Sequence, residues 1–259
     1  MAHEWTDDEM AIVLKLYCEL PRGKTNQSNP EVIRIAKLIG RTPASVNMRL
    51  GNYAAVDSDY TKDGKKGLDH VGKNVKETWN KFSNSMEKLT EMVDAAMKRA
   101  YGYEADEMNL AMTHSFEVFP AGGEVEQTIM ARKNQSFFRT VVLSSYNNRC
   151  CITGIDERSL LNASHIKPWR DSAPDTERTN PQNGLCLNVL HDRAFDRGLL
   201  TIGAKDHKII ISKSLKRNVD SDAYEKFFGI YEDRRITMPT KFPPGEVFLR
   251  YHNESVFEH

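Results

Sequence analysis

The sequence lacks long apolar runs and is poor in cysteine. None of its apolar runs approaches the roughly 18–20 residues that a membrane span requires. Its opening residues, MAHEWTDDEM, are acidic and polar, which is not the pattern of a secretory signal. The four cysteines are too few and too scattered for a disulfide framework; they are Cys18, Cys150, Cys151 and Cys186. We therefore expect a cytoplasmic protein with no membrane segment.

Net charge is also absent, because 36 Lys and Arg residues balance 36 Asp and Glu residues. The distribution is uneven, however. Residues 22–49 contain six basic residues and one acid, and residues 128–150 contain four basic residues and no acid. Residues 101–126 lie between them with six acids and no Lys or Arg. Two basic segments that flank an acidic one suit a protein that meets phosphate at two places, although solvated basic faces give the same pattern.

The first part of the chain predicts helices. Thr6 and Glu9 form a capping-box pattern before the periodic stretch MAIVLKLYCEL, which stops at Pro21. A second helix is predicted to open at Ser28-Asn29-Pro30-Glu31 and to end at Gly40. A third is predicted to start at Thr42-Pro43.

The second and third helices, joined by a tight turn, resemble a helix-turn-helix in the phrase IAKLIGRTPASVNMRL. Such a unit places side chains of its second helix on base edges and phosphates. The predicted DNA contacts here are Arg41, Asn47 and Arg49. An ordinary helical bundle remains the alternative.

Further along, residues 57–73 are rich in Gly, Lys and Asp and predict a loop. Residues 75–101 carry large apolar side chains at intervals of three or four and predict one long helix. The acidic stretch that follows contains the breaker Pro120-Ala121-Gly122-Gly123. The predicted organisation is therefore a DNA-recognition domain over 1–75, a connecting helix and acidic linker over 76–127, and a third part over 128–259.

Three linked phrases carry the most specific signal: RKNQSFFRTVVLSSYNNRCCITG, LLNASHIKPW and NPQNGLCLNVLHDRAFDRGLLTI. In this order and spacing, over roughly residues 128–215, they resemble the HNH endonuclease family, in the branch common among bacterial restriction-type nucleases. The resemblance extends weakly to FLRYHNESVF near the C-terminus. It implies an α+β fold in which a ββα-metal nuclease domain with a C-terminal extension fills residues 128–259.

His165 is the predicted catalytic base. It lies in the apolar run LLNASHI, which predicts a strand that Pro168-Trp169 would terminate. A histidine held at a strand end has a pKa suited to general-base work near neutrality, where the neutral ring is the active form. A structural histidine is the alternative for any single His.

Asn183 and His191 complete the pattern. The amide of Asn183, in a turn-rich loop, can bond backbone on both sides and so hold the loop to the His165 strand. The resemblance makes His191, at the start of the predicted helix NVLHDRAFD, the metal ligand. One histidine with phosphate oxygens and waters suits Mg²⁺ or Mn²⁺.

Other residues near the pattern bear on how a metal ion could be held. Many family members carry an acid or a histidine just before the catalytic histidine, but this chain has Ser164. Asp196 is five positions after His191, a poor angle for a shared ion, and is expected to cap the helix or to bond Arg193 or Arg197. Adjacent Cys150 and Cys151 rarely grip one tetrahedral ion, so we expect buried thiols and no structural zinc.

We expect the protein to be a metal-dependent DNA endonuclease that acts as a restriction enzyme. Its candidate phosphate contacts in the third part are Lys167, Arg170, Arg193 and Arg197. An HNH site normally cuts one strand, so a double-strand break suggests a homodimer on double-stranded DNA. The alternatives are a non-catalytic DNA-binding regulator with a decayed nuclease module, and a colicin-like toxin or homing nuclease.

Overall fold

A computed structural model describes residues 4–62, 71–83, 85–101 and 125–259. The chain divides into two compact units, residues 1–138 and 139–259. The boundary falls within helix α8 (Val125–Ser145). The first unit is helical, while the second combines helices with short antiparallel strands, which confirms the predicted α+β fold.

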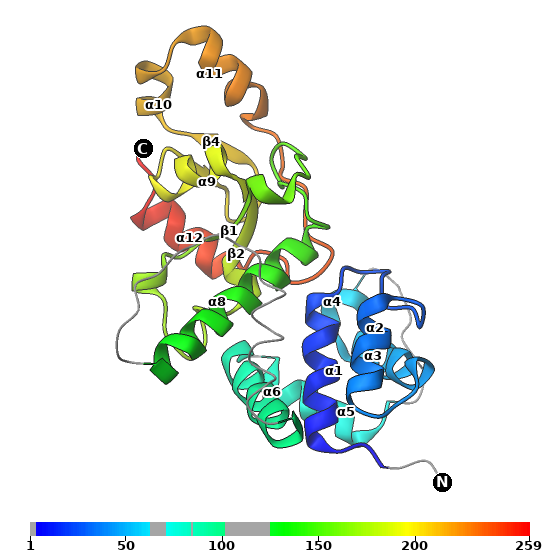
Figure 1. Cartoon of the computed structure of the whole chain (residues 1–259). Coiled ribbons are helices and arrows are strands. Elements are labelled where there is room, and N and C mark those ends of the chain that lie inside the picture. The colour runs from blue at the N-terminus through cyan, green and yellow to red at the C-terminus, as the bar shows by residue number, and fades with distance from the viewer. Residues whose placement is uncertain (1–3, 63–70, 84, 102–124) are drawn as a thin grey trace. The chain divides into compact units, whose positions relative to one another are not determined.

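The first unit packs around helix α1 (Asp7–Glu19), which is buried along most of its length. Figure 1 shows α1 between α6 on one side and α2 and α3 on the other. The remaining helices of this unit are α2 (Pro30–Leu38), α3 (Pro43–Val56), α4 (Ser58–Thr61), α5 (Lys73–Phe82) and α6 (Met86–Tyr101).

The predicted starts of these helices are confirmed. Thr6 forms a full capping box with Glu9, and Asn29 and Thr42 cap α2 and α3 through their side chains. Gly40 adopts φ +67° in the turn between α2 and α3, a conformation that side chains other than glycine rarely adopt.

Two sequence predictions about the middle of the chain are wrong. Residues 75–101 form two helices rather than one, because Ser83 ends α5 and the hydroxyl of Ser85 accepts from the backbone of Lys88 at the start of α6. Part of the predicted 57–73 loop is also helical, since Asp57 caps the short helix α4. The acidic stretch and its Pro-Gly breaker lie outside the described residues.

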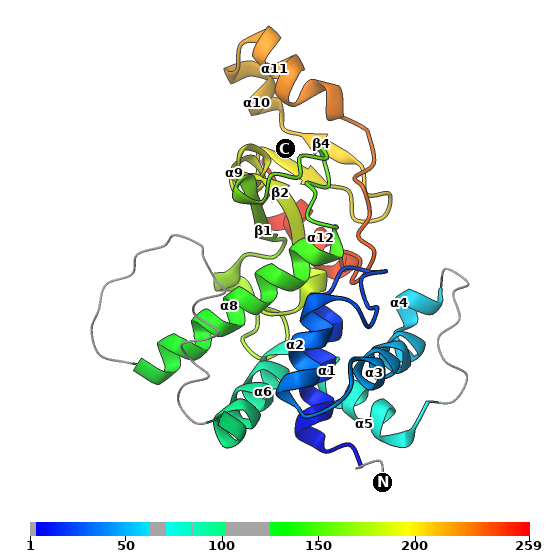
Figure 2. The same cartoon turned by 45° about the vertical axis from the view of Figure 1, so that its right-hand side comes forward.

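The second unit contains a β-hairpin, β1 (Leu161–His165) and β2 (Gly184–Asn188), followed by helix α9 (Val189–Asp196). In the hairpin His165 pairs with Gly184 and Leu161 with Asn188. Every residue of β2 is buried, which fixes the hairpin beneath α9. This is the predicted ββα arrangement, shown from a second direction in Figure 2.

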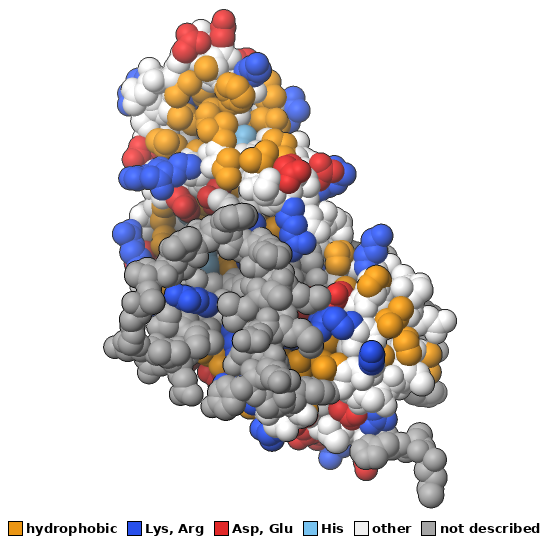
Figure 3. Space-filling model, viewed as in Figure 1, with side chains coloured by type: hydrophobic (Ala, Val, Ile, Leu, Met, Phe, Trp, Pro, Cys, Tyr) orange, Lys and Arg blue, Asp and Glu red, His pale blue; other side chains and the backbone are white. Residues whose placement is uncertain are grey.

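A second hairpin and a group of short helices complete this unit. The strands are β3 (Leu200–Ile202) and β4 (Ile209–Ile211), and the helices are α10 (Lys213–Asn218), α11 (Ser221–Phe227) and α12 (Glu246–Ser255). Short 3-10 segments are η1 (Arg158–Leu160), η2 (Trp169–Asp171), η3 (Pro181–Asn183) and η4 (Gly229–Tyr231). Figure 3 shows hydrophobic side chains gathered on the surface around α10 and α11, where Phe227 and Ile230 are exposed.

Helix α12 is anchored by a fully buried histidine. The ring of His252 stacks on Phe195 with centroids 3.7 Å apart, its Nε2 donates to the Phe195 carbonyl, and its Nδ1 lies 2.7 Å from the Thr201 hydroxyl. Both ring nitrogens are therefore satisfied in the neutral form. Burial lowers the pKa of His252 to about 4.

We expect this histidine to make the fold sensitive to acid. Between about pH 6.5 and about pH 4 the unfolded chain binds a proton at His252 that the folded chain does not, so stability falls as the pH falls through this window, by on the order of 3 kcal/mol. Denaturant unfolding of the native protein and of His252→Gln would check it. The native protein should be the more stable at neutral pH, and its advantage should shrink toward pH 4; a constant difference would contradict the expectation.

Candidate active site

His165 lies at the end of β1, where the backbone of the following loop binds its ring. Its Nε2 is 2.8 Å from the backbone carbonyl oxygen of Arg178. Because a carbonyl can only accept, Nε2 carries the proton of the neutral ring, and Nδ1 carries the lone pair. Burial lowers the pKa of His165, while the Arg178 carbonyl partly opposes this shift. The ring is therefore neutral at neutral pH, as a general base must be.

Asn183 ties the long connection between β1 and β2 to the end of β1. Its side chain is fully buried. Its Oδ1 accepts from the backbone of Lys167 at 2.8 Å, and its Nδ2 donates to the carbonyls of Lys167 and Glu177 and to the Ser172 hydroxyl, each at 3.2 Å. These bonds are the ones that an ordering role beside His165 would require.

His191 lies in the first turn of α9 and is nearly inaccessible. Asn188 caps this helix, and its Oδ1 also accepts from Nδ1 of His191 at 3.1 Å. The lone pair is thus on Nε2, a buried atom with no hydrogen-bond partner among the described residues. The rings of Phe228 and Tyr231 lie against the imidazole at 5.3 and 5.5 Å. An ion at Nε2 would have to reach a nitrogen that is buried.

Asp192 is the acid that the sequence analysis missed. Its two carboxylate oxygens accept from Ser164 and from Asn162, both on β1. Ser164 immediately precedes His165, so this carboxylate is tied to the strand that carries the predicted base. Ser164, which stands where many family members have an acid or a histidine, is therefore hydrogen-bonded to a carboxylate from α9.

Asp196 follows Asp192 by four positions, which places both on one side of α9. Partial desolvation of its carboxylate, and next the negative charge of Asp192, raise the pKa of Asp196 to about 6, although the residue as a whole is exposed. Among the described residues, Asp196 makes no hydrogen bond or ion pair with Arg193 or Arg197, although the charges of both arginines partly oppose the rise in its pKa. The spacing of four residues between Asp192 and Asp196 is the sequence signal for this pair of carboxylates.

The donors on this side of α9 suit a hard divalent ion, because Mg²⁺ prefers carboxylate oxygens and keeps several waters. Two neighbouring carboxylates whose charges oppose each other are relieved by a cation. No three His, Cys, Asp or Glu side chains converge as a metal cage within the described ranges. A site here would therefore use few protein ligands.

The predicted phosphate contacts of this unit differ in exposure. Lys167 is largely covered, with its ammonium 2.6 Å from Glu177 and 5.2 Å from the Tyr251 ring. Arg170 is 84% exposed, and Arg193 and Arg197 are exposed as well. The three arginines are open to a phosphate, whereas Lys167 would first have to leave Glu177.

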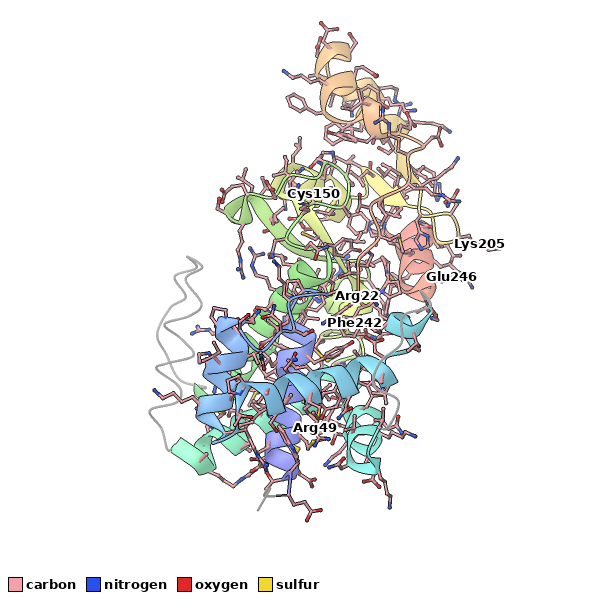
Figure 4. The ribbon with its side chains drawn as sticks, turned by 90° about the vertical axis from the view of Figure 1, so that its right-hand side faces the viewer. Arg22, Arg49, Cys150, Lys205, Phe242 and Glu246 are labelled. Atoms are coloured by element: carbon pink, nitrogen blue, oxygen red, sulfur yellow. The ribbon has the colours of Figure 1, made fainter. Side chains whose placement is uncertain are left out.

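In the first unit, Arg41 and Arg49 both lie against Trp5. Each guanidinium carbon is 4.6 Å from the centre of that ring, and Arg41 also bonds both carboxylate oxygens of Glu9. Arg49, labelled on α3 in Figure 4, has a buried Nε with no acceptor among the described residues. Asn47 is half-buried, and Met48 is 63% exposed. The two arginines thus pack within the unit, which sequence periodicity alone could not reveal.

The cysteines are all buried free thiols, as expected. Three of them gather at the hairpin, where the backbone of Cys151 donates to the carbonyl of Cys186 at 2.8 Å. Burial raises the pKa of Cys151 and raises that of Cys186 to about 12. Cys151 and Cys186 are therefore protonated, inert thiols at neutral pH. Figure 4 labels the neighbouring Cys150.

Comparison with known families decides what this arrangement is. A family model described as HNH endonuclease matches residues 150–203, the segment that contains the ββα arrangement. This segment is an HNH endonuclease domain. His165, Asn183 and His191 all lie within it, as do Asp192 and Asp196. A search of the curated proteins finds none that matches the chain.

The match supports a nuclease activity in general for this segment, and an HNH domain implies a DNA substrate. Among the residues that the structure describes, no helix has the length and apolar character needed to cross a bilayer.

Proposed function

We propose that this protein is a metal-dependent DNA endonuclease in which His165 is the general base. The observation that carries the proposal is the bond from Nε2 of His165 to the Arg178 carbonyl. It leaves Nδ1 as the basic nitrogen of a neutral ring at the end of β1. From this position Nδ1 takes a proton from the attacking water, and the Arg178 carbonyl stabilises the resulting imidazolium.

The rest of the domain prepares this step. Asn183 holds the connection after β1, so that the Arg178 carbonyl stays in place. Exposed Arg170, Arg193 and Arg197 bind phosphates of the DNA backbone. When bound, Mg²⁺ or Mn²⁺ would polarise the scissile phosphate and stabilise the leaving oxygen.

We propose that the ion is held by Asp192 and Asp196. They supply oxygen donors on one side of α9, and Asp192 is bonded to the residue before His165. His191 is the second candidate, favoured by its unpaired Nε2. It is the weaker candidate, because that nitrogen is buried.

The rate of cleavage should depend on pH through His165. Burial lowers the pKa of this group, so the neutral, active ring should predominate down to a pH below the usual histidine range. We expect the single-turnover rate at saturating metal to rise with pH through an apparent pKa below about 6.5 and then to level off. A rate that still rises steeply above neutrality would contradict a neutral His165 as the base.

We further propose a restriction role on foreign DNA in the cytoplasm. The first unit would read the DNA through α3, supported by the helix–turn–helix order of α2 and α3 and by the basic excess of residues 22–49. Because one HNH site cuts one strand, a double-strand break would need a homodimer. The restriction role would be tested by comparing cleavage of methylated and unmethylated target DNA by the same preparation of the protein. Sedimentation of the protein on DNA would test the dimer.

Recognition by α3 predicts different results for two neighbouring residues. Asn47→Ala should weaken sequence-specific binding by about 1–3 kcal/mol if Asn47 reaches a base edge, without changing the thermal unfolding of the protein. Arg49→Ala should lower the unfolding temperature as well, because its guanidinium packs on Trp5. Binding and unfolding of both variants are the measurements. Unchanged binding for Asn47→Ala and Arg49→Ala would make α3 a scaffold helix.

A further inference from the structure

Trp169 and Arg178 form a second set of contacts around His165. The indole of Trp169 stands nearly perpendicular to the imidazole, with centroids 5.5 Å apart and an interplanar angle of 87°. The guanidinium carbon of Arg178 lies 5.1 Å from the centre of the Trp169 ring. His165, Trp169 and Arg178 therefore form a closed triangle in which Arg178 contacts the other two.

Arg178 takes part in this triangle through two different groups. Its backbone carbonyl accepts from Nε2 of His165, and its side chain covers Trp169 while Nε donates to the carbonyl of Ser172 at 3.2 Å. Ser172 is buried, and its hydroxyl bonds the carbonyls of Lys167 and Pro168. The side chain of Arg178 is thus anchored to the same loop that Asn183 fixes.

The bond at Nε2 does not by itself hold the imidazole. A single hydrogen bond fixes one atom of the ring, but the ring can still tilt. Tilting moves Nδ1 and weakens the bond on which the tautomer depends. A bulky ring packed at right angles blocks this tilt, and a planar guanidinium lying on that ring keeps it from swinging into solvent. A shift of about 1 Å in a catalytic group can cost about 10²-fold in rate.

We propose that Trp169 and the side chain of Arg178 are positioning residues that hold the His165 ring in its reactive orientation. This inference rests on the proposed role of His165 as the base. It assigns to Arg178 a task other than binding DNA, although it is a basic residue near the site. In this role Trp169 acts through its contact with the His165 ring.

The first test compares binding with cleavage in the full-length protein. Trp169→Leu should lower the single-turnover rate at saturating DNA and Mg²⁺ by about 10- to 100-fold, and Arg178→Met by about 10-fold, while the Kd for the duplex changes by less than about threefold. Trp169→Phe, which keeps a flat ring, should recover most of the rate. Arg234→Met, which removes an exposed arginine of the same unit, is the matched control and should leave rate and Kd unchanged.

The second test needs no activity. The ¹⁵N shifts of the His165 ring should show one tautomer, protonated at Nε2, in the native protein and in Trp169→Phe. In Trp169→Leu and Arg178→Met they should show a mixture of tautomers. This readout reports the ring itself and applies even if the proposed cleavage is not found.

The two proposals fail in different ways. If the native protein cuts DNA and needs His165, but Trp169→Leu and Arg178→Met cut at the native rate with one tautomer, the positioning role is wrong. If Arg178→Met raises Kd and weakens its salt dependence while the saturating rate is unchanged, Arg178 is a phosphate contact instead. If the native protein does not cut under any metal, the proposed function fails, and the ¹⁵N measurement still decides whether Trp169 and Arg178 hold the ring.

Discussion

His165→Ala is expected to lower the single-turnover rate of DNA cleavage by at least about 10²-fold, the usual contribution of a general base. The variant should still bind the duplex, because the exposed arginines that would meet the phosphates are unchanged. The methyl group also leaves the Arg178 carbonyl without its donor, so the loop before β2 should loosen slightly.

His165→Asn is the matched variant, since an amide can still donate to the Arg178 carbonyl but cannot act as a base. Both variants should be equally slow if proton transfer is what His165 supplies. A native rate in His165→Asn would mean that the residue only holds the loop, and another group would have to be the base.

Asp192→Asn is expected to have the next largest effect. The amide keeps the size of the side chain and can still accept from Ser164 or Asn162, but it removes a negative oxygen from the proposed ion site. The cleavage rate at low Mg²⁺ should fall by about 10²-fold, equivalent to about 3 kcal/mol, and should recover in part as Mg²⁺ or Mn²⁺ is raised.

Two further variants separate the possible explanations. Ser164→Ala removes a partner of Asp192 without touching the carboxylate, so it should shift the metal requirement less than Asp192→Asn does. His191→Gln should lower stability through lost packing against Phe228 and Tyr231 and leave the metal requirement unchanged. If His191→Gln abolishes metal dependence and Asp192→Asn does not, His191 is the ligand.

Local signals in the sequence were sufficient for much of the fold. The capping residues Thr6, Asn29 and Thr42 and the His165 strand are short-range features, and each stands where the sequence predicted it. The break between α5 and α6 was missed because apolar spacing continues across it, whereas the serines that end one helix and start the next are weak signals.

The candidate site was predictable only where its parts are close in sequence. The bond between Asp192 and Ser164 joins residues on different elements, and no spacing rule relates them. The same holds for Arg49, whose partner Trp5 lies before α1. Periodicity indicates which side of a helix a residue is on, but not which distant side chain will cover it.

The most direct test of the account is cleavage of a supercoiled plasmid by the native protein with Mg²⁺ or Mn²⁺ and with chelator, on methylated and unmethylated DNA, beside His165→Ala. If the protein is a metal-dependent endonuclease with His165 as its base, nicked or linear plasmid should appear only when the native protein and a divalent ion are both present, on at least one of the two DNA preparations. Plasmid that stays intact on both preparations with either metal, although the protein binds it, would contradict the account, as would equal cutting by His165→Ala.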